Sequence, residues 1–158
     1  MHDPGARRMA RRKLEPNPQA ELVAYSDQEP SAFASMLGGL IEANVRSNPA
    51  KLEDFDRLVA RVGIFVTDID EGVTLDFKGG RLVVHNGLEP MRTITIRAEA
   101  ETVMNLSNLK IGPLGMPVYF DQVGRGVALK LLRGRLKIDG LIPNVLTVNA
   151  ATRVFSVQ

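Results

Sequence analysis

Apolar and polar residues alternate along residues 73–84, and the pattern predicts a β-hairpin. Every second position from residue 73 to residue 77 is apolar, and the same period returns at Leu82 and Val84. Strict alternation is typical of strands with one buried and one solvated face. Lys78-Gly79-Gly80 lies between the two runs and tolerates the positive φ angles of a tight reversal. The apolar face of this hairpin must be covered by other segments.

Further strands are expected on either side of the hairpin in the sequence. Ile94 and Ile96 alternate with polar residues after a break at residues 86–90. Residues 62–67 are expected to form an earlier strand. The pattern leaves open whether its even-numbered or its odd-numbered residues turn inward. Residues 134–140 predict a late strand bounded by glycines, with Leu136 and Ile138 on one side.

Helical spacing marks the segments that can cover the sheet. Apolar residues between 33 and 45 recur at helical spacing after Ser31, and Asn48-Pro49 can cap and begin a second helix. A glycine pair at residues 38–39 weakens the first helix unless another segment approaches its backbone closely. A third helix is expected from about Glu99, a short one after Asp121, and a helical or irregular apolar segment over residues 141–148.

The chain of 158 residues has the length of one domain and the composition of a globular protein, with 44% hydrophobic and 24% charged residues. We divide it into a basic, proline-containing arm at residues 1–30, expected to be disordered, and one domain at residues 31–158. The sequence contains no apolar run of the roughly 20 residues that span a bilayer and no apolar signal-peptide core. A cytoplasmic location is therefore expected.

The formal net charge of +2 is unevenly distributed. Residues 1–13 carry five basic residues and one acidic residue, a net charge of +4, so the remaining chain carries −2. A mildly acidic body argues against nucleic-acid binding, because affinity for a duplex comes mostly from neutralised phosphates. The arm is compatible with adhesion to an anionic membrane or a nucleic acid, or with a merely solubilising role.

The residues that most enzymes require are missing. Without cysteines the chain has no disulfide, zinc-thiolate site or thiol nucleophile, and its two histidines are too few for a histidine-rich metal centre. It also lacks a Gly-x-Ser-x-Gly elbow and a phosphate-binding loop. The carboxylates of residues 68–72 suit a solvated turn better than a calcium loop. We therefore expect a protein that is not an enzyme and uses no metal or cofactor.

Two features suggest an apolar ligand cavity or a surface that binds a partner. The expected helices carry more apolar residues than a tight two-layer core requires, which fits either an apolar cavity or a filled core. Residues 111–120 combine Gly and Pro with large apolar side chains, which exposed loops seldom carry together. This segment must pack on the body, close an opening, or contact a partner.

Three motifs in this order resemble the sterol carrier protein type 2 family: residues 73–84, Thr93-Ile-Thr-Ile followed by Ala98-Glu-Ala-Glu, and Gly134-Arg-Leu-Lys-Ile-Asp-Gly140. The resemblance covers about residues 33–157. It implies an α+β fold, a five-stranded, mostly antiparallel mixed sheet covered on one face by helices. An apolar tunnel between the layers would hold fatty acyl groups or sterols. The expected function is non-enzymatic lipid binding or transfer, and the alternative is a protein-interaction or dimerisation module of the same fold.

The resemblance also implies a ligand site made of inward-facing apolar residues. Those of the sheet are Leu75, Phe77, Leu82, Val84, Ile94, Ile96, Leu136 and Ile138, and those of the cover are Val103, Met104 and Leu106. Met116, Tyr119 and Phe120 belong to the segment that matches least and are hypothesised to form a lid or rim. The expected partners are a hydrophobic small molecule, a transient anionic membrane surface, and a homodimer or protein partner. Basic residues 125–137 could meet a carboxylate, a phosphate or an anionic membrane, or could form a solvated basic face. The high arginine share suggests a bacterial source.

Overall fold

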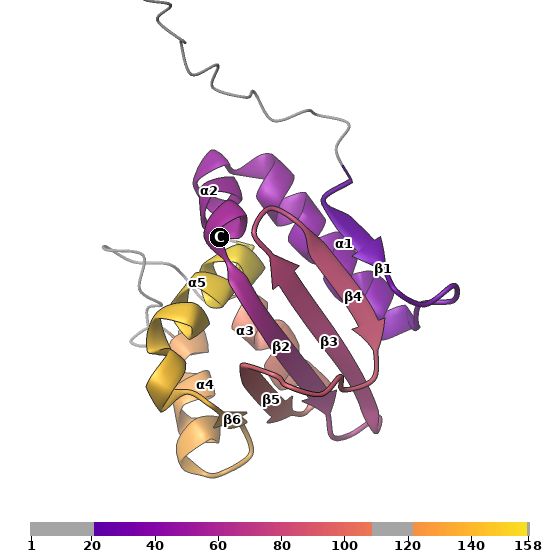
Figure 1. The fold of residues 1–158 in the computed structure, drawn as a ribbon. Coiled ribbons are helices and arrows are strands. Elements are labelled where there is room, and N and C mark those ends of the chain that lie inside the picture. Colours follow the sequence, from indigo (N-terminus) through magenta and orange to yellow (C-terminus); the bar gives the residue numbers. More distant parts are fainter. Residues whose placement is uncertain (1–20, 109–121, 158) are drawn as a thin grey trace, which may run out of the picture.

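The computed structural model describes residues 21–108 and 122–157, and its centre is one mixed sheet (Figure 1). Of the five pairs of neighbouring strands in the described residues, three are antiparallel and two are parallel. The α+β class and the mostly antiparallel mixed sheet are confirmed, but the described part of the chain has six strands where five were expected. In spatial order the strands are β1 (Val23–Tyr25), β4 (Leu82–Asn86), β3 (Glu71–Lys78), β2 (Val59–Val66), β5 (Ile94–Ala98) and β6 (Lys137–Asp139).

The additional strand, β1, lies in the range assigned to the N-terminal arm. It pairs in parallel with the first residues of β4, and Val23 is buried. A Cβ atom at Gly38 of the first helix would lie only 2.5 Å from Tyr25 Oη, so this glycine provides the close approach that the glycine pair suggested. Three residues are too few to show strand periodicity in a sequence. Residues 23–25 thus belong to the sheet, and residues 1–20 lie outside the described residues.

The helices cover one face of the sheet (Figure 1). Asn48 Oδ1 accepts a hydrogen bond from the Ala50 amide at 3.0 Å, so the expected N-cap of the second helix is present. Ser31 Oγ accepts one from the Ala34 amide at 3.1 Å and caps the first helix in the same way. The helical elements are α1 (Ala32–Ser47), α2 (Pro49–Arg57), α3 (Ala100–Ser107), α4 (Gln122–Leu132), the 3-10 turn η2 (Ile142–Asn144) and α5 (Val145–Phe155).

The connection from β4 to β5 crosses the outer face of the sheet and fixes which residues of β2 face inward. A Cβ atom at Gly63 would lie 2.4 Å from Arg92 Cδ and 3.1 Å from Leu88 Cδ2. Gly63 therefore makes room for this connection on the outer face. The even-numbered residues Val62 and Ile64 consequently face the helices, where both are buried.

Candidate ligand-binding cavity

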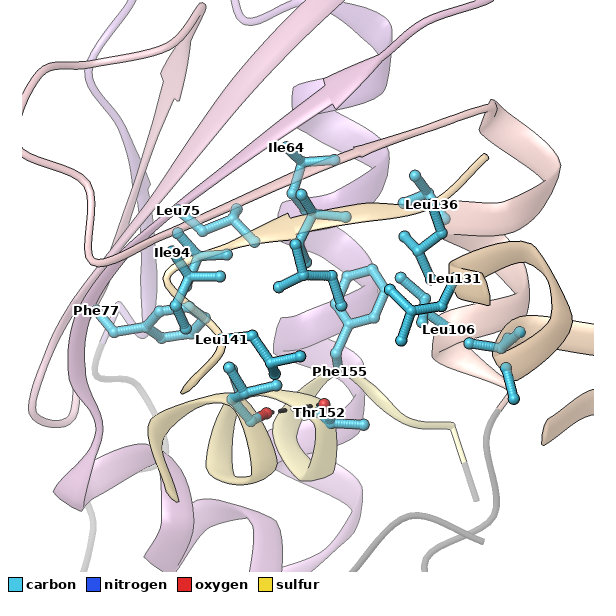
Figure 2. Close-up of a pocket in the computed structure, with 18 residues that line it drawn as sticks. Ile64, Leu75, Phe77, Ile94, Leu106, Leu131, Leu136, Leu141, Thr152 and Phe155 are labelled. Carbon is cyan, nitrogen blue, oxygen red and sulfur yellow. Dashed lines mark hydrogen bonds between the residues drawn. The ribbon is translucent and has the colours of Figure 1, made fainter. Parts of the chain in front are cut away.

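An apolar cavity of about 380 Å³ lies between the sheet and the helices (Figure 2). Strand register builds its floor, because residues that pair across neighbouring strands point to the same face. Val62 pairs with Leu75 on one side and with Ile94 on the other. The floor residues are Val62, Ile64, Leu75, Phe77, Ile94, Ile96, Leu136 and Ile138.

Three helices and the turn before α5 supply the rest of the lining. Residues 148, 151, 152 and 155 of α5 recur at the spacing of a single helical face, and this face points into the cavity. Alanines at positions 128 and 151 leave space that larger side chains would fill. The residues of the cover are Val103, Leu106, Val127, Ala128, Leu131, Leu141, Val148, Ala151, Thr152 and Phe155.

Among the lining residues that the structure describes, Thr152 is the only one with a polar side chain. Its hydroxyl donates a hydrogen bond to the Val148 carbonyl oxygen at 2.8 Å within α5 (Figure 2). The described lining residues therefore offer neither a charged group nor a titratable side chain to a bound molecule. Elsewhere in the described residues, no group of three or more His, Asp or Glu side chains could hold a metal ion. Such a cavity can desolvate hydrocarbon but cannot neutralise a charged headgroup.

Polar contacts from α1 and α2 fasten the α5 wall. Arg153 forms a two-point ion pair with Asp54. Asn44 Nδ2 donates to the carbonyl oxygen of residue 155 at 3.0 Å, and the Lys51 ammonium group donates to the Ser156 carbonyl oxygen. Burial lowers the pKa of Lys51 below its ordinary value, because a charged amine loses water there. These contacts hold the wall of the cavity in place.

Eight of the fourteen predicted site residues lie in the lining. They come from β3, β5, α3 and the strand region around β6: Leu75, Phe77, Ile94, Ile96, Val103, Leu106, Leu136 and Ile138. Their place in the wall is observed, whereas ligand binding by them stays a prediction. Met116, Tyr119 and Phe120 lie outside the described residues.

Three predicted residues do not line the cavity. Leu82 and Val84 pair with Phe77 and Leu75, and so face the helices, but they are fully buried where α1 covers β4 and β1. Side chains fill that end of the sheet. Met104 is one position beyond Val103, about 100° further around the helix, which turns it away from the cavity.

Several lining residues were not predicted from the sequence. Val62 and Ile64 were left open because alternation alone does not say which set of residues faces inward. The α5 residues carried a detectable signal, since spacing of i, i+3, i+4 and i+7 over positions 148–155 predicts one helical face. The remaining unassigned residues lie on α4 or in the turn before α5: Val127, Ala128, Leu131 and Leu141.

No family model matches the chain, and no curated protein matches it. Among solved structures, the chain is similar to one described as "UbiJ-SCP2 Ubiquinone synthesis protein", with a TM-score of 0.57 and 14% identity over 78% of this chain and 92% of that one. A crystal structure of sterol carrier protein 2 aligns with a TM-score of 0.44 and 15% identity over 74% of this chain and 91% of that one. The second likeness is too weak to support an argument. The first shows the fold alone.

Proposed function

We propose that this chain, which has the sterol carrier protein type 2 fold, binds and carries a hydrophobic ligand in the cavity between its sheet and helices. The ligand would be a fatty acyl lipid or a sterol, and the protein would not be an enzyme. The observation that carries the proposal is the apolar lining: among its described residues the single hydroxyl, that of Thr152, already has a partner. Ligand pockets of this size and character commonly bind small apolar molecules.

The size of the cavity makes such binding energetically feasible. A methylene group occupies roughly the volume of a water molecule, about 30 Å³, so 380 Å³ holds roughly a dozen methylenes. Burying them at about 0.8 kcal/mol each contributes about 10 kcal/mol, against an association cost of about 4–15 kcal/mol. Micromolar binding is therefore reasonable for a preformed cavity.

The lining also limits how a ligand is oriented. A carboxylate or phosphate inside the cavity would lose its water without gaining a cation or an available donor, which is strongly unfavourable. The hydrocarbon part of an amphiphile therefore belongs inside and its polar end outside. An uncharged sterol, whose single hydroxyl can remain at the surface, meets the same condition.

Native mass spectrometry of the gently purified protein, followed by organic extraction, tests the proposal directly. We expect a stoichiometric acyl lipid or sterol, and a fluorescent fatty-acid probe should bind to protein stripped of it. A polyprenyl quinone should be included in the competition panel, because the similar solved protein is described as a ubiquinone synthesis protein. Protein that carries no lipid and ignores every probe would contradict the proposal. It would favour the interaction module instead.

A further inference from the structure

Charge is divided sharply between the two described parts of the chain. Residues 21–108 contain eight Lys and Arg and fourteen Asp and Glu, a net charge of −6. Residues 122–157 contain six Lys and Arg and one acidic residue, a net charge of +5. That acidic residue, Asp139, lies 3.9 Å from the side chain of Arg97, so a cation already faces it. Two of the six cations, Lys130 and Arg153, face Glu101 and Asp54 of the first part. The exposed cations of α4, β6 and the segment between them include Arg133, Arg135 and Lys137.

Exposed aliphatic side chains accompany this charge where the chain turns from β6 into α5. Ile142 is 88% exposed, Leu146 is 83% exposed and Val145 is 47% exposed. None of the three lines the cavity, whereas Leu141 before them and Val148 after them do. We call Ile142, Val145 and Leu146 the β6–α5 corner. It stands on the outside of the molecule, directly beside the cavity wall.

We propose that the β6–α5 corner, with the exposed cations Arg133, Arg135 and Lys137, docks this chain on an anionic lipid bilayer. The inference rests on the proposed function and names the place where the ligand is exchanged. The cations are attracted to an anionic surface within about one Debye length, and the aliphatic side chains enter the headgroup boundary. Docking here would place the cavity wall formed by Leu141 and α5 next to the lipids.

A bilayer fits this surface better than an acidic protein does. The corner offers aliphatic side chains and no aromatic or hydrogen-bonding anchor, whereas protein interfaces concentrate their energy in aromatic residues and arginines set in desolvated pockets. The three cations are exposed and belong to the end of the chain that carries almost no acidic residues. Diffuse positive charge beside aliphatic groups is the composition that binds membrane interfaces.

Sedimentation with vesicles tests the proposal on the full-length protein. The vesicles are phosphatidylcholine alone or phosphatidylcholine mixed with phosphatidylglycerol. We expect binding to the mixed vesicles only, and its loss in 1 M salt, where the Debye length falls to about 3 Å. Each cation changed to glutamine should weaken binding about fivefold, the equivalent of about 1 kcal/mol. The variants are Arg133→Gln, Arg135→Gln, Lys137→Gln and the double variant Ile142→Glu/Leu146→Glu.

Matched controls separate the corner from the rest of the surface. Arg81→Gln changes an exposed cation in the β3–β4 turn, and Met91→Glu changes a side chain that is 91% exposed in the loop before β5. Both controls should bind vesicles as the unaltered chain does. If Ile142→Glu/Leu146→Glu also binds unchanged, another segment such as basic residues 7–13 carries the binding and the inference is overturned.

A second readout keeps this inference distinct from the proposed function. The corner residues do not line the cavity, so the variants should bind a fluorescent fatty-acid probe in solution with unchanged affinity while their transfer of the probe to anionic vesicles slows. Probe binding without any vesicle binding would overturn the docking surface and leave the carrier proposal standing. Failure to bind the probe at all would overturn the carrier proposal itself.

Discussion

Asp54 and Arg153 join α2 to α5 through two parallel contacts between residues that are 99 positions apart. Arg153 Nε lies 2.8 Å from Asp54 Oδ2, and Nη2 lies 2.9 Å from Oδ1. Their side chains are about one-quarter exposed, so this pair is screened less than an ordinary surface pair. The hydrogen bonds that Arg153 donates to the Asp54 carboxylate raise the pKa of Arg153 above its ordinary value, so this side chain stays charged. The pair holds α5 and therefore one wall of the cavity.

Arg153→Met should lower the free energy of unfolding by about 1–2 kcal/mol, because a partly buried two-point pair is lost while the aliphatic packing is kept. Urea unfolding measures the change. Arg46→Met is the matched control, since it breaks an exposed i, i+4 pair with Glu42 and should cost less than about 0.5 kcal/mol. Equal losses of stability in the two variants would show that the α2–α5 pair stabilises the protein no more than an exposed surface pair does.

Lys51 should make the stability of the protein depend on pH in the alkaline range. Its pKa is lowered by burial in the folded chain but lies near 10.4 when the chain is unfolded. Between these two values the unfolded chain binds more protons, so stability rises with pH there. Below the folded pKa this contribution is constant.

The measurement compares the unaltered protein with Lys51→Met in urea from pH 8 to 11. Their difference removes the contributions of other titrating groups, including Tyr25, whose pKa burial raises. The free energy of unfolding of the unaltered protein, minus that of the variant, should increase as the pH rises toward 10.4. A constant or falling difference would contradict the effect of burial on this lysine.

The two glycines of α1 should respond differently to alanine. No atom lies within 4 Å of a Cβ at Gly39, so Gly39→Ala should stabilise the protein by about 0.5–1 kcal/mol through helix propensity. At Gly38 the new methyl would meet the hydroxyl of Tyr25, and the ring must move. We expect Gly38→Ala to be less stable than Gly39→Ala by about 1 kcal/mol in urea unfolding. Equal stability would mean that β1 does not pack closely on α1.

A large side chain in the floor should block the cavity without unfolding the protein. Ile94 is buried in the wall, and Ile94→Trp should fill space that a ligand would occupy, so affinity for a fatty-acid probe should fall at least tenfold, about 1.4 kcal/mol. Val83→Trp, on the outer face of β4, is the matched control and should keep full affinity. Unfolding of Ile94→Trp alone would instead indicate a floor that is already tightly packed.

The hydroxyl of Thr152 should be dispensable for binding. It is satisfied by the Val148 carbonyl, and valine has nearly the same shape, so Thr152→Val should change probe affinity less than about twofold and stability less than about 1 kcal/mol. Probe titration and urea unfolding measure the two effects. A tenfold loss of affinity with unchanged stability would identify the hydroxyl as a ligand anchor and contradict the purely apolar interpretation of the site.

Local pattern predicted most of the elements but fewer of the contacts between them. The hairpin, the N-cap at Asn48 and the late strand follow from period, glycine pairs and capping residues, which act over a few positions. The direction of Val62 was not predictable in this way, because it depends on the connection that crosses Gly63. The strand β1 carries no periodic signal in its three residues.

For the candidate site, too, local pattern predicted which face of the sheet a residue is on but not whether the space above it is filled. Alternation placed Leu82 on the correct face of the sheet, yet α1 fills the space above it, and this depends on tertiary packing that no local pattern records. Conversely, Leu75 and Ile94 line the cavity, and the lining residues that α4 and α5 contribute include the small Ala128 and Ala151. Hollow and filled regions of one layer therefore share the same sequence pattern.

A wall of apolar side chains, in which the described hydroxyl of Thr152 is already hydrogen-bonded, imposes a particular kind of selectivity. A site without polar anchors distinguishes molecules by length, width and stiffness, since methylene, ring and branch differ there only in the space they occupy. Two molecules with similar apolar moieties and unrelated headgroups would then bind with nearly equal affinity. The cargo found in the protein would reflect the abundance of such molecules in its surroundings more than any chemical mark that they carry.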